Sequence, residues 1–175
     1  MKTVAVVVTY LELDVAARRA LPGPLPAAPA AELQLERIAP PAVADVAATM
    51  YRAVGGPWHW TDRLPWTGEE WRRAVDQDAV ELWVACVAGD TAGYFELHVA
   101  DDAVELKYIG LLPEFTGRRI GGTLLSAAID RARCLGRPRM TVNTCTLDHP
   151  AALPNYLKRG FTVVKTEAQR RTVAV

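Results

Sequence analysis

The chain has 175 residues, of which 50% are hydrophobic and 23% charged, the composition of a globular domain of ordinary size. Lysine and arginine together number 20, and so do aspartate and glutamate, so the overall charge gives no reason to expect a nucleic-acid or membrane partner. No stretch approaches the roughly 18 consecutive apolar residues of a spanning helix. We therefore expect a cytoplasmic protein.

Three cysteines, Cys86, Cys134 and Cys145, are scattered along the chain and odd in number. No two of them have the spacing of metal ligands, and a disulfide framework would need an even set. This pattern favours reduced, mostly buried thiols in a cytoplasmic protein, with no metal site. The alternative is a catalytic cysteine, which would need a histidine base nearby.

The N-terminal part is a valine-rich strand over residues 2–13, followed by a proline-rich connector over 21–31. The connector is too short to separate two domains, because the first strand could not fold alone. We interpret it as a strap that returns the strand to the main sheet. Residues 1–31 are therefore expected to pack on a domain that occupies residues 32–175.

The domain itself is predicted to be α/β, with a mixed, mostly antiparallel central sheet flanked by helices. Strands at 81–88, 92–100 and 104–111 are separated by turn residues and predict an antiparallel meander. The other predicted elements are a strand at 32–38, helices at 41–52 and 68–76, a helix at 118–135, a strand at 139–144, a helix at 149–159 and a strand at 161–166.

The segment from Leu106 to Leu125 is suited to anion binding. It reads as a strand, a turn at Pro113, a loop with two arginines, and an amphipathic helix. The first N–H groups of a helix have no partner within the helix, and the helix dipole adds partial positive charge there. Gly121 and Gly122 lack a Cβ atom, so a phosphate can approach the backbone closely. The alternative is that the two glycines serve only close packing of the helix on the sheet.

In this segment the chain resembles the GNAT superfamily of N-acetyltransferases. The family's pyrophosphate loop reads Gln or Arg, two residues, Gly, one residue, and Gly or Ala; Arg118 and Gly121 match it, and Thr123 takes the last small position. The family also commonly has a Tyr four residues before a Gly-Phe pair, as Tyr156 is here. The resemblance covers about residues 32–166 and implies the GNAT fold, with a splayed V between two strands.

The resemblance implies acetyl-CoA, or another acyl-CoA, as the co-substrate. The pantetheine arm is expected to bond to the splayed strand edge like an added strand, with the pyrophosphate on the N–H groups of the loop. The residues expected to bind the donor are Leu111, Leu112, Arg118, Arg119, Ile120, Gly121, Gly122 and Thr123. Residues 117–140 hold six arginines against one acid, Asp130, which favours a polyanion-binding side over a merely solvated helix face.

Amine acylation needs a neutral amine and a proton for the departing thiolate. Tyr156 is the candidate acid, because a phenol near the sulfur can donate a proton; core packing is the alternative role. If a two-residue hairpin joins the second and third meander strands, Glu96 lies opposite Lys107. His98 then lies opposite Glu105. Glu96 and Glu105 are the candidate bases, directly or through a water, and surface ion pairs are the alternative.

The acceptor site is predicted around the tryptophan-rich segment 55–66. Its three tryptophans, with a histidine, an aspartate and an arginine, give a short loop an amphipathic, hydrogen-bonding surface. The residues expected to bind the acceptor are Trp58, His59, Trp60, Asp62, Arg63 and His98. The alternative is that the tryptophans anchor the loop in a small core.

The sequence therefore predicts an enzyme that moves an acetyl or other acyl group from acyl-CoA to a primary amine of a small molecule or peptide. Two alternatives stay open: an acyltransferase with an aminoacyl-tRNA or carrier-protein thioester as donor, and a non-catalytic acyl-CoA sensor. The neutral total charge speaks against an RNA partner. A homodimer, in which the N-terminal strand extends a sheet across the interface, is an arrangement that the resemblance allows.

Overall fold

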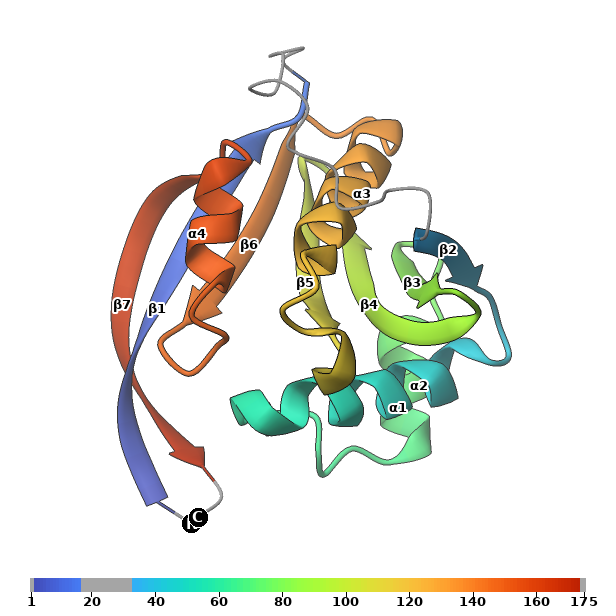
Figure 1. Cartoon of the computed structure of the whole chain (residues 1–175), viewed down its shortest axis with the longest axis horizontal. Helices are drawn as coiled ribbons and strands as arrows, with labels where there is room; N and C mark the ends of the chain where they lie inside the picture. Colours follow the sequence, from blue (N-terminus) through green and yellow to red (C-terminus); the bar gives the residue numbers. More distant parts are fainter. Residues whose placement is uncertain (1, 17–32, 174–175) are drawn as a thin grey trace.

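The computed structural model describes residues 2–16 and 33–173. These residues form a seven-stranded sheet in the order β2-β3-β4-β5-β6-β1-β7, flanked by helices (Figure 1). The strands are β1 (Lys2–Asp14), β2 (Leu33–Ile38), β3 (Val80–Val87), β4 (Asp90–Val99), β5 (Ala103–Leu111), β6 (Arg139–Cys145) and β7 (Thr162–Val173). The α-helices are α1 (Val43–Gly55), α2 (Gly68–Val75), α3 (Ile120–Cys134) and α4 (Ala152–Lys158).

The predicted meander of β3, β4 and β5 is confirmed, and all its pairings are antiparallel. Ala88 and Gly89, between β3 and β4, have φ angles of 52° and 86°. Two consecutive left-handed residues match the right-handed twist of the flanking strands, which is why this turn favours a glycine. The meander forms the half of the sheet on which α1, α2 and α3 pack.

The sheet separates two hydrophobic cores. One core contains α1 and α2, and the other contains α3 together with residues from α4 and β1. Successive residues of a strand point to opposite faces, so Tyr94 of β4 enters the first core and Phe95 enters the second. No helix within the described part of the chain is long and apolar enough to cross a membrane.

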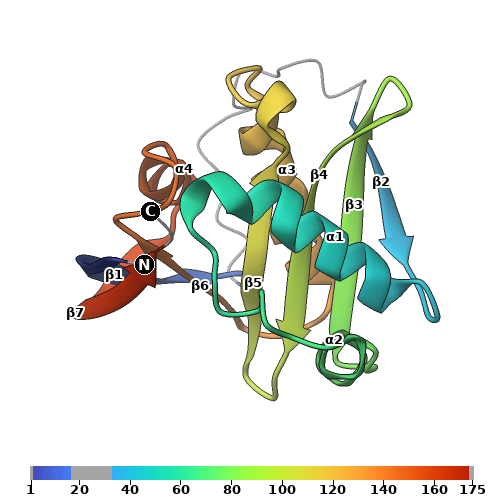
Figure 2. The same ribbon diagram turned by 90° about the horizontal axis from the view of Figure 1, so that it is seen from below.

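The sheet is split between β5 and β6. These parallel strands pair only where Ala103–Glu105 lies beside Arg139–Thr141, and they separate beyond that point. The splayed V predicted from the resemblance is therefore present. Figure 2 shows α1 crossing the meander, with β1 and β7 set apart on the other side of the split.

The first strand of the chain lies inside the second half of the sheet. β1 is antiparallel to β6 on one side and to β7 on the other, and Val8 pairs with both Cys145 and Glu167. β7, which continues past the predicted end at residue 166 to Val173, is therefore the strand at this edge. The proline-rich connector 21–31 lies outside the described residues, so the division at residue 31 stays a prediction.

Both helices that flank the split begin later than predicted. α3 begins at Ile120 after Arg119, whose φ of 63° is left-handed, and it ends before Gly136, where a φ of 70° confirms the expected cap. α4 begins at Ala152 instead of at His149. The physical reason is a turn in which the His149 Nδ1 accepts a hydrogen bond of 3.0 Å from the Ala151 N–H.

Candidate active site

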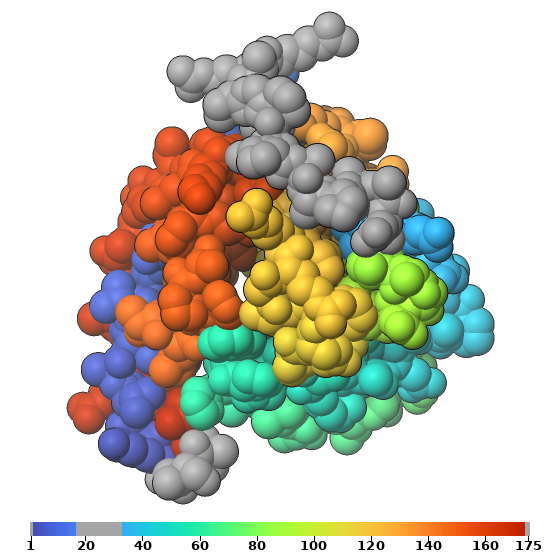
Figure 3. Space-filling model, in the orientation of Figure 1, coloured from blue at the N-terminus to red at the C-terminus, as the bar shows by residue number. Residues whose placement is uncertain are grey.

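A cavity of about 1250 Å³ occupies the split between β5 and β6. Its walls come from β5, the start of α3, the end of β6, α4 and the loop that follows α1. Figure 3 shows it as a hollow between the surface of α4 and that of the first turns of α3. Because the two strands separate there, the cavity reaches the sheet itself, and Leu106, Tyr108 and Leu111 of β5 line it.

The loop predicted to bind the donor forms part of the cavity wall. Leu111, Arg119, Gly121 and Gly122 line it, as Thr116 does. Four other predicted donor residues, Leu112, Arg118, Ile120 and Thr123, are not among its described lining residues. The Arg118 guanidinium instead lies over the Phe115 ring, 5.0 Å from its centroid. The donor contacts of all eight residues stay predictions.

The arginines of residues 117–140 do not form one polyanion-binding side. Four of the six have partners elsewhere, and this explains the charge asymmetry without a ligand. Arg131 pairs with Glu81, Arg133 with Asp130, and Arg139 with Glu12 and Asp102, while Arg137 donates to the Ala100 carbonyl. Arg118 and Arg119 are the two that lie at the start of α3.

An aromatic wall, formed by Trp58, Trp60 and Tyr108, also lines the cavity. The Trp60 and Tyr108 ring centroids are 4.9 Å apart. Asp62 also lines the cavity and accepts hydrogen bonds of 2.6 Å from the Tyr108 hydroxyl and 2.9 Å from the Tyr51 hydroxyl. Burial raises the pKa of Asp62, but the bonds from the tyrosines outweigh burial and leave this pKa below its ordinary value. Asp62 is therefore charged at neutral pH.

A second carboxylate, Asp148, contacts the aromatic wall at Trp60. It accepts hydrogen bonds from Trp60 Nε1 (3.4 Å), the Thr144 hydroxyl (2.7 Å) and the Cys145 backbone N–H (2.8 Å). These donors orient the carboxylate at the end of β6, where it lines the cavity. Sequence reasoning missed Asp148 and Tyr108. The available signal for Asp148 was its position in the loop that follows β6, because loops often carry the residues of a site.

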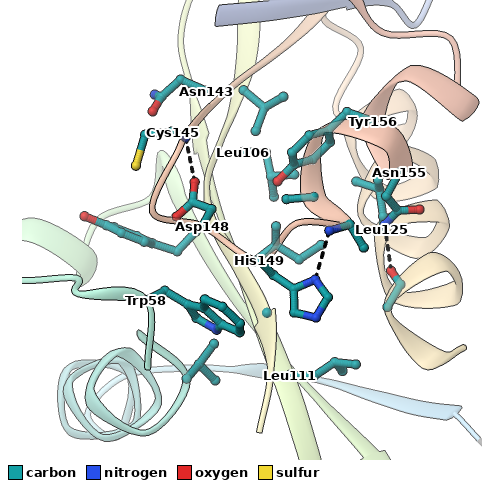
Figure 4. A pocket seen from close by; sticks show the side chains of 18 of the residues that line it. Trp58, Leu106, Leu111, Leu125, Asn143, Cys145, Asp148, His149, Asn155 and Tyr156 are labelled. Atoms are coloured by element: carbon teal, nitrogen blue, oxygen red, sulfur yellow. Dashed lines mark hydrogen bonds between the residues drawn. The ribbon is translucent and has the colours of Figure 1, made fainter. Parts of the chain in front are cut away.

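Tyr156 lies on α4 and lines the cavity. Its side chain is 6% exposed, and its ring packs edge-on against Phe161 with centroids 5.6 Å apart. Burial raises the pKa of Tyr156, and the nearby charge of Asp148 raises it further. The phenol is therefore neutral at physiological pH. Figure 4 shows its hydroxyl end directed into the cavity, toward the side on which Asp148 lies.

The predicted cross-strand patch is only partly correct. His98 lies opposite Glu105 as expected, but Glu96 lies opposite Tyr108 and not opposite Lys107. The reason is a β-bulge, which shifts the register between Glu96 and Leu97 and leaves Lys107 as the extra residue.

Glu96 is a buried anchor of the tryptophan-rich loop. Its side chain is 1% exposed, and each of its oxygens accepts a 2.9 Å hydrogen bond from the Arg63 guanidinium. His98 Nε2 lies 2.6 Å from Glu96 Oε1. Burial raises the pKa of Glu96, but the bonds from His98 and Arg63 outweigh burial and leave this pKa below its ordinary value.

Five of the predicted catalytic and acceptor residues are not among the described lining residues of the cavity: His59, Arg63, Glu96, His98 and Glu105. Glu105 forms a 3.1 Å ion pair with Lys107 at the surface. Arg63 is 3% exposed and lies over the rings of Tyr108 and Trp66, at 4.5 Å and 4.7 Å. The tryptophan-rich segment is divided between two places, since Trp58 and Trp60 line the cavity while the Trp66 ring packs against Arg63. The catalytic and acceptor roles of the predicted residues stay predictions.

Comparisons with known proteins agree with this architecture. Residues 43–161 match the family model described as the acetyltransferase (GNAT) family. The fold is similar to a GCN5-related N-acetyltransferase from Sphaerobacter thermophilus, with a TM-score of 0.70 and 15% identity over 95% of this chain and 51% of that one. None of the curated proteins matches the chain in sequence.

Two other solved structures are named for their acceptors. The ribosomal-protein-S18-alanine N-acetyltransferase from Escherichia coli has a TM-score of 0.58 and 16% identity over 74% of this chain and 77% of that one. An aminoglycoside acetyltransferase from an uncultured soil metagenomic sample has a TM-score of 0.60 and 15% identity over 74% of this chain and 88% of that one.

Identities this low show the fold alone. The chain spans 51% to 61% of the length of the Sphaerobacter protein and of two further solved structures. The family model, in contrast, matches the greater part of the sequence and includes both segments that line the two sides of the split. The chain therefore belongs to the GNAT acetyltransferase family.

Proposed function

We propose that the protein is an N-acyltransferase that moves an acetyl or other acyl group from acyl-CoA to a primary amine. The observation that carries this proposal is one continuous cavity whose wall combines two chemically different groups of residues. The N-terminus of α3, Arg119 and Gly121 suit the diphosphate of a CoA thioester. The aromatic wall and two carboxylates suit a protonated amine.

The reaction forms a C–N bond and breaks the C–S bond of the thioester. Asp148 lies where it can take the proton of the attacking amine, directly or through a water. The departing thiolate receives a proton from Tyr156, which burial keeps neutral. Glu96 and Glu105 stay possible bases by the sequence prediction, but the position of Asp148 in the cavity wall favours Asp148 over both.

The acceptor is a small molecule or a peptide with a free amino group. Two structural neighbours are named for acceptors of these kinds: one for a small molecule, an aminoglycoside, and the other for a ribosomal protein. In this chain the aromatic wall offers π faces to a cation, and Asp62 offers a charged carboxylate. A cytoplasmic location and a homodimer stay predictions of the sequence, but β1 is not the strand that extends a sheet across an interface, because it pairs with β6 on one side and β7 on the other.

Acetyl-CoA should raise the unfolding temperature of the protein. A ligand at 100 times its dissociation constant adds about 2.7 kcal/mol to the free energy of unfolding, because it binds the folded state alone. Thermal unfolding with and without acetyl-CoA measures this effect, and release of free thiol with a panel of primary amines measures turnover. Stabilisation without thiol release across the panel would favour the acyl-CoA sensor. Absence of stabilisation would favour a donor carried on a tRNA or a carrier protein.

The two carboxylates that contact the aromatic wall, Asp62 and Asp148, should respond differently to the same substitution. Asp62→Asn should raise the KM of the best amine about tenfold with kcat nearly unchanged, since a hydrogen bond to a charged group contributes about 1.5–3 kcal/mol. Asp148→Asn should instead lower kcat about tenfold to a hundredfold, because the proton acceptor is lost. Steady-state kinetics with saturating acetyl-CoA separate the two effects. An unchanged kcat in Asp148→Asn would remove Asp148 from the proposed mechanism.

A further inference from the structure

Arg159 is a buried arginine in the cavity wall, in contact with the predicted donor loop at Gly122. It follows α4, lines the cavity and is 5% exposed. Its Nε donates a 3.0 Å hydrogen bond to the Ser126 hydroxyl, and its Nη2 donates a 2.5 Å bond to the Gly122 carbonyl. Its Nη1 donates to the Asn155 side-chain oxygen. The side chain therefore joins α4 to the first turn of α3.

The guanidinium of Arg159 has only neutral acceptors. Among the residues that the structure describes, no carboxylate lies within ion-pair distance of it, and burial lowers its pKa. The other deeply buried arginine, Arg63, has the Glu96 carboxylate. Leaving a buried cation without a counter-charge is unfavourable, and the positive end of a helix dipole beside it adds to the cost.

No acidic residue in the first turn of α3 compensates for this charge. Arg118 and Arg119 add further positive charge just before the helix. The start of α3 therefore combines a helix N-terminus, two arginines in the preceding loop and a buried guanidinium beneath it. An anion in the adjoining cavity would balance these charges.

Gly122 and Arg159 fit each other closely. A Cβ atom at position 122 would lie 2.6 Å from Arg159 Nη2, whereas a Cβ at position 121 would meet nothing closer than Leu111 Cδ1 at 3.7 Å. The absence of a side chain at Gly122 thus makes room for the guanidinium. This gives Gly122 a different role from the close phosphate approach predicted from the sequence.

We propose that Arg159 is the residue that makes the enzyme prefer thioester donors with a diphosphate over donors that consist of the pantetheine arm alone. Its guanidinium bonds to the Gly122 carbonyl, which fixes the first turn of α3 and places a positive charge close to the proposed diphosphate site. Arg159 is a positioning residue in this role, since it touches the donor loop and not the reacting atoms. The inference rests on the proposed use of acyl-CoA.

The test compares two donors, acetyl-CoA and S-acetylpantetheine, which share the thioester and the pantetheine arm. In Arg159→Met, kcat/KM with acetyl-CoA should fall about tenfold or more, since a charge-assisted contact is lost, while kcat/KM with S-acetylpantetheine should change less than about twofold. Arg159→Lys, which keeps the charge, should recover part of the preference. Arg73→Met, the same substitution at a side chain 73% exposed on α2, should change neither value.

A second measurement uses the fit between the two residues. Gly122→Ala should push the guanidinium aside and lower kcat/KM with acetyl-CoA in the native background. In the Arg159→Met background the same change should have little further effect, because the space is already free. Strictly additive effects of the two substitutions would contradict the proposal.

Equal losses with both donors in Arg159→Met would show a purely structural role and overturn the inference. So would an Arg159→Lys variant that behaves like Arg159→Met. If Arg159→Met does not fold, Arg159→Lys and Gly122→Ala still give the ratio of the two donors. A native protein that does not use acetyl-CoA would instead overturn the proposed function itself.

Discussion

Replacing Tyr156 by phenylalanine should lower kcat about a hundredfold to a thousandfold, with the KM values of donor and amine nearly unchanged. The substitution removes the hydroxyl that is proposed to protonate the thiolate, but it keeps the ring that packs against Phe161. Steady-state thiol release with acetyl-CoA and the best amine measures kcat. Thermal unfolding in parallel shows whether the fold is kept.

Tyr94→Phe is the matched control for this prediction. Tyr94 is 0% exposed, and its hydroxyl has no hydrogen-bond partner within the described structure. It is not among the described lining residues of the cavity, so loss of its hydroxyl should leave kcat unchanged. Normal turnover in Tyr156→Phe would show that water or another group protonates the thiolate, and that Tyr156 serves the core.

Arg63→Met should lower the free energy of unfolding by about 3–5 kcal/mol, the usual cost of leaving one member of a buried ion pair without its partner. The substitution leaves the Glu96 carboxylate, which is 1% exposed, without its arginine partner. It also removes the cation that lies over Tyr108 and Trp66. Urea unfolding measures the change. The double variant Arg63→Met/Glu96→Leu should recover much of the loss, because no charge then stays buried.

The exposed pair of Lys165 and Glu167 provides the control, since Lys165→Met should leave the stability nearly unchanged.

The pH dependence of the free energy of unfolding gives an independent test of Glu96. The folded-state pKa of Glu96 lies below its ordinary value, so its stabilising contribution is present above about pH 4.3 and is lost as the pH falls through the folded-state pKa. The native protein should therefore lose stability over that acid range, and Arg63→Met should lose less. Equal acid sensitivity in both proteins would contradict this account of Glu96.

Local sequence signals predicted the elements that depend on neighbouring residues. The turn at Gly89, the cap at Gly136 and the alternation of the meander strands are set within a few residues, and the structure confirms them. The split beside β5 followed from the resemblance of two motifs. The split could not be predicted from hydrophobic periodicity. A strand that separates from its neighbour shows the same alternation of apolar and polar residues as a strand that stays paired.

The features that sequence reasoning missed depend on contacts between distant segments. A bulge of one residue at Glu96 changes which side chains face each other, and nothing in the local composition specifies it. Arg159 reads as a surface residue at the end of a short helix, and its burial arises only when α4 packs against Gly122. The ion pair of Arg131 on α3 with Glu81 on β3 likewise joins residues that are far apart in the sequence.

The position of β1 has a consequence for how the polypeptide matures. Lys2 pairs with Val173, and the ends of the described chain lie together at the foot of the molecule in Figure 1. β1 is synthesised before β6 and β7, so this valine-rich strand has no ladder partners until those later strands have been synthesised. Contacts of such long sequence separation close late and slowly, and the waiting strand is a natural target for chaperones during synthesis.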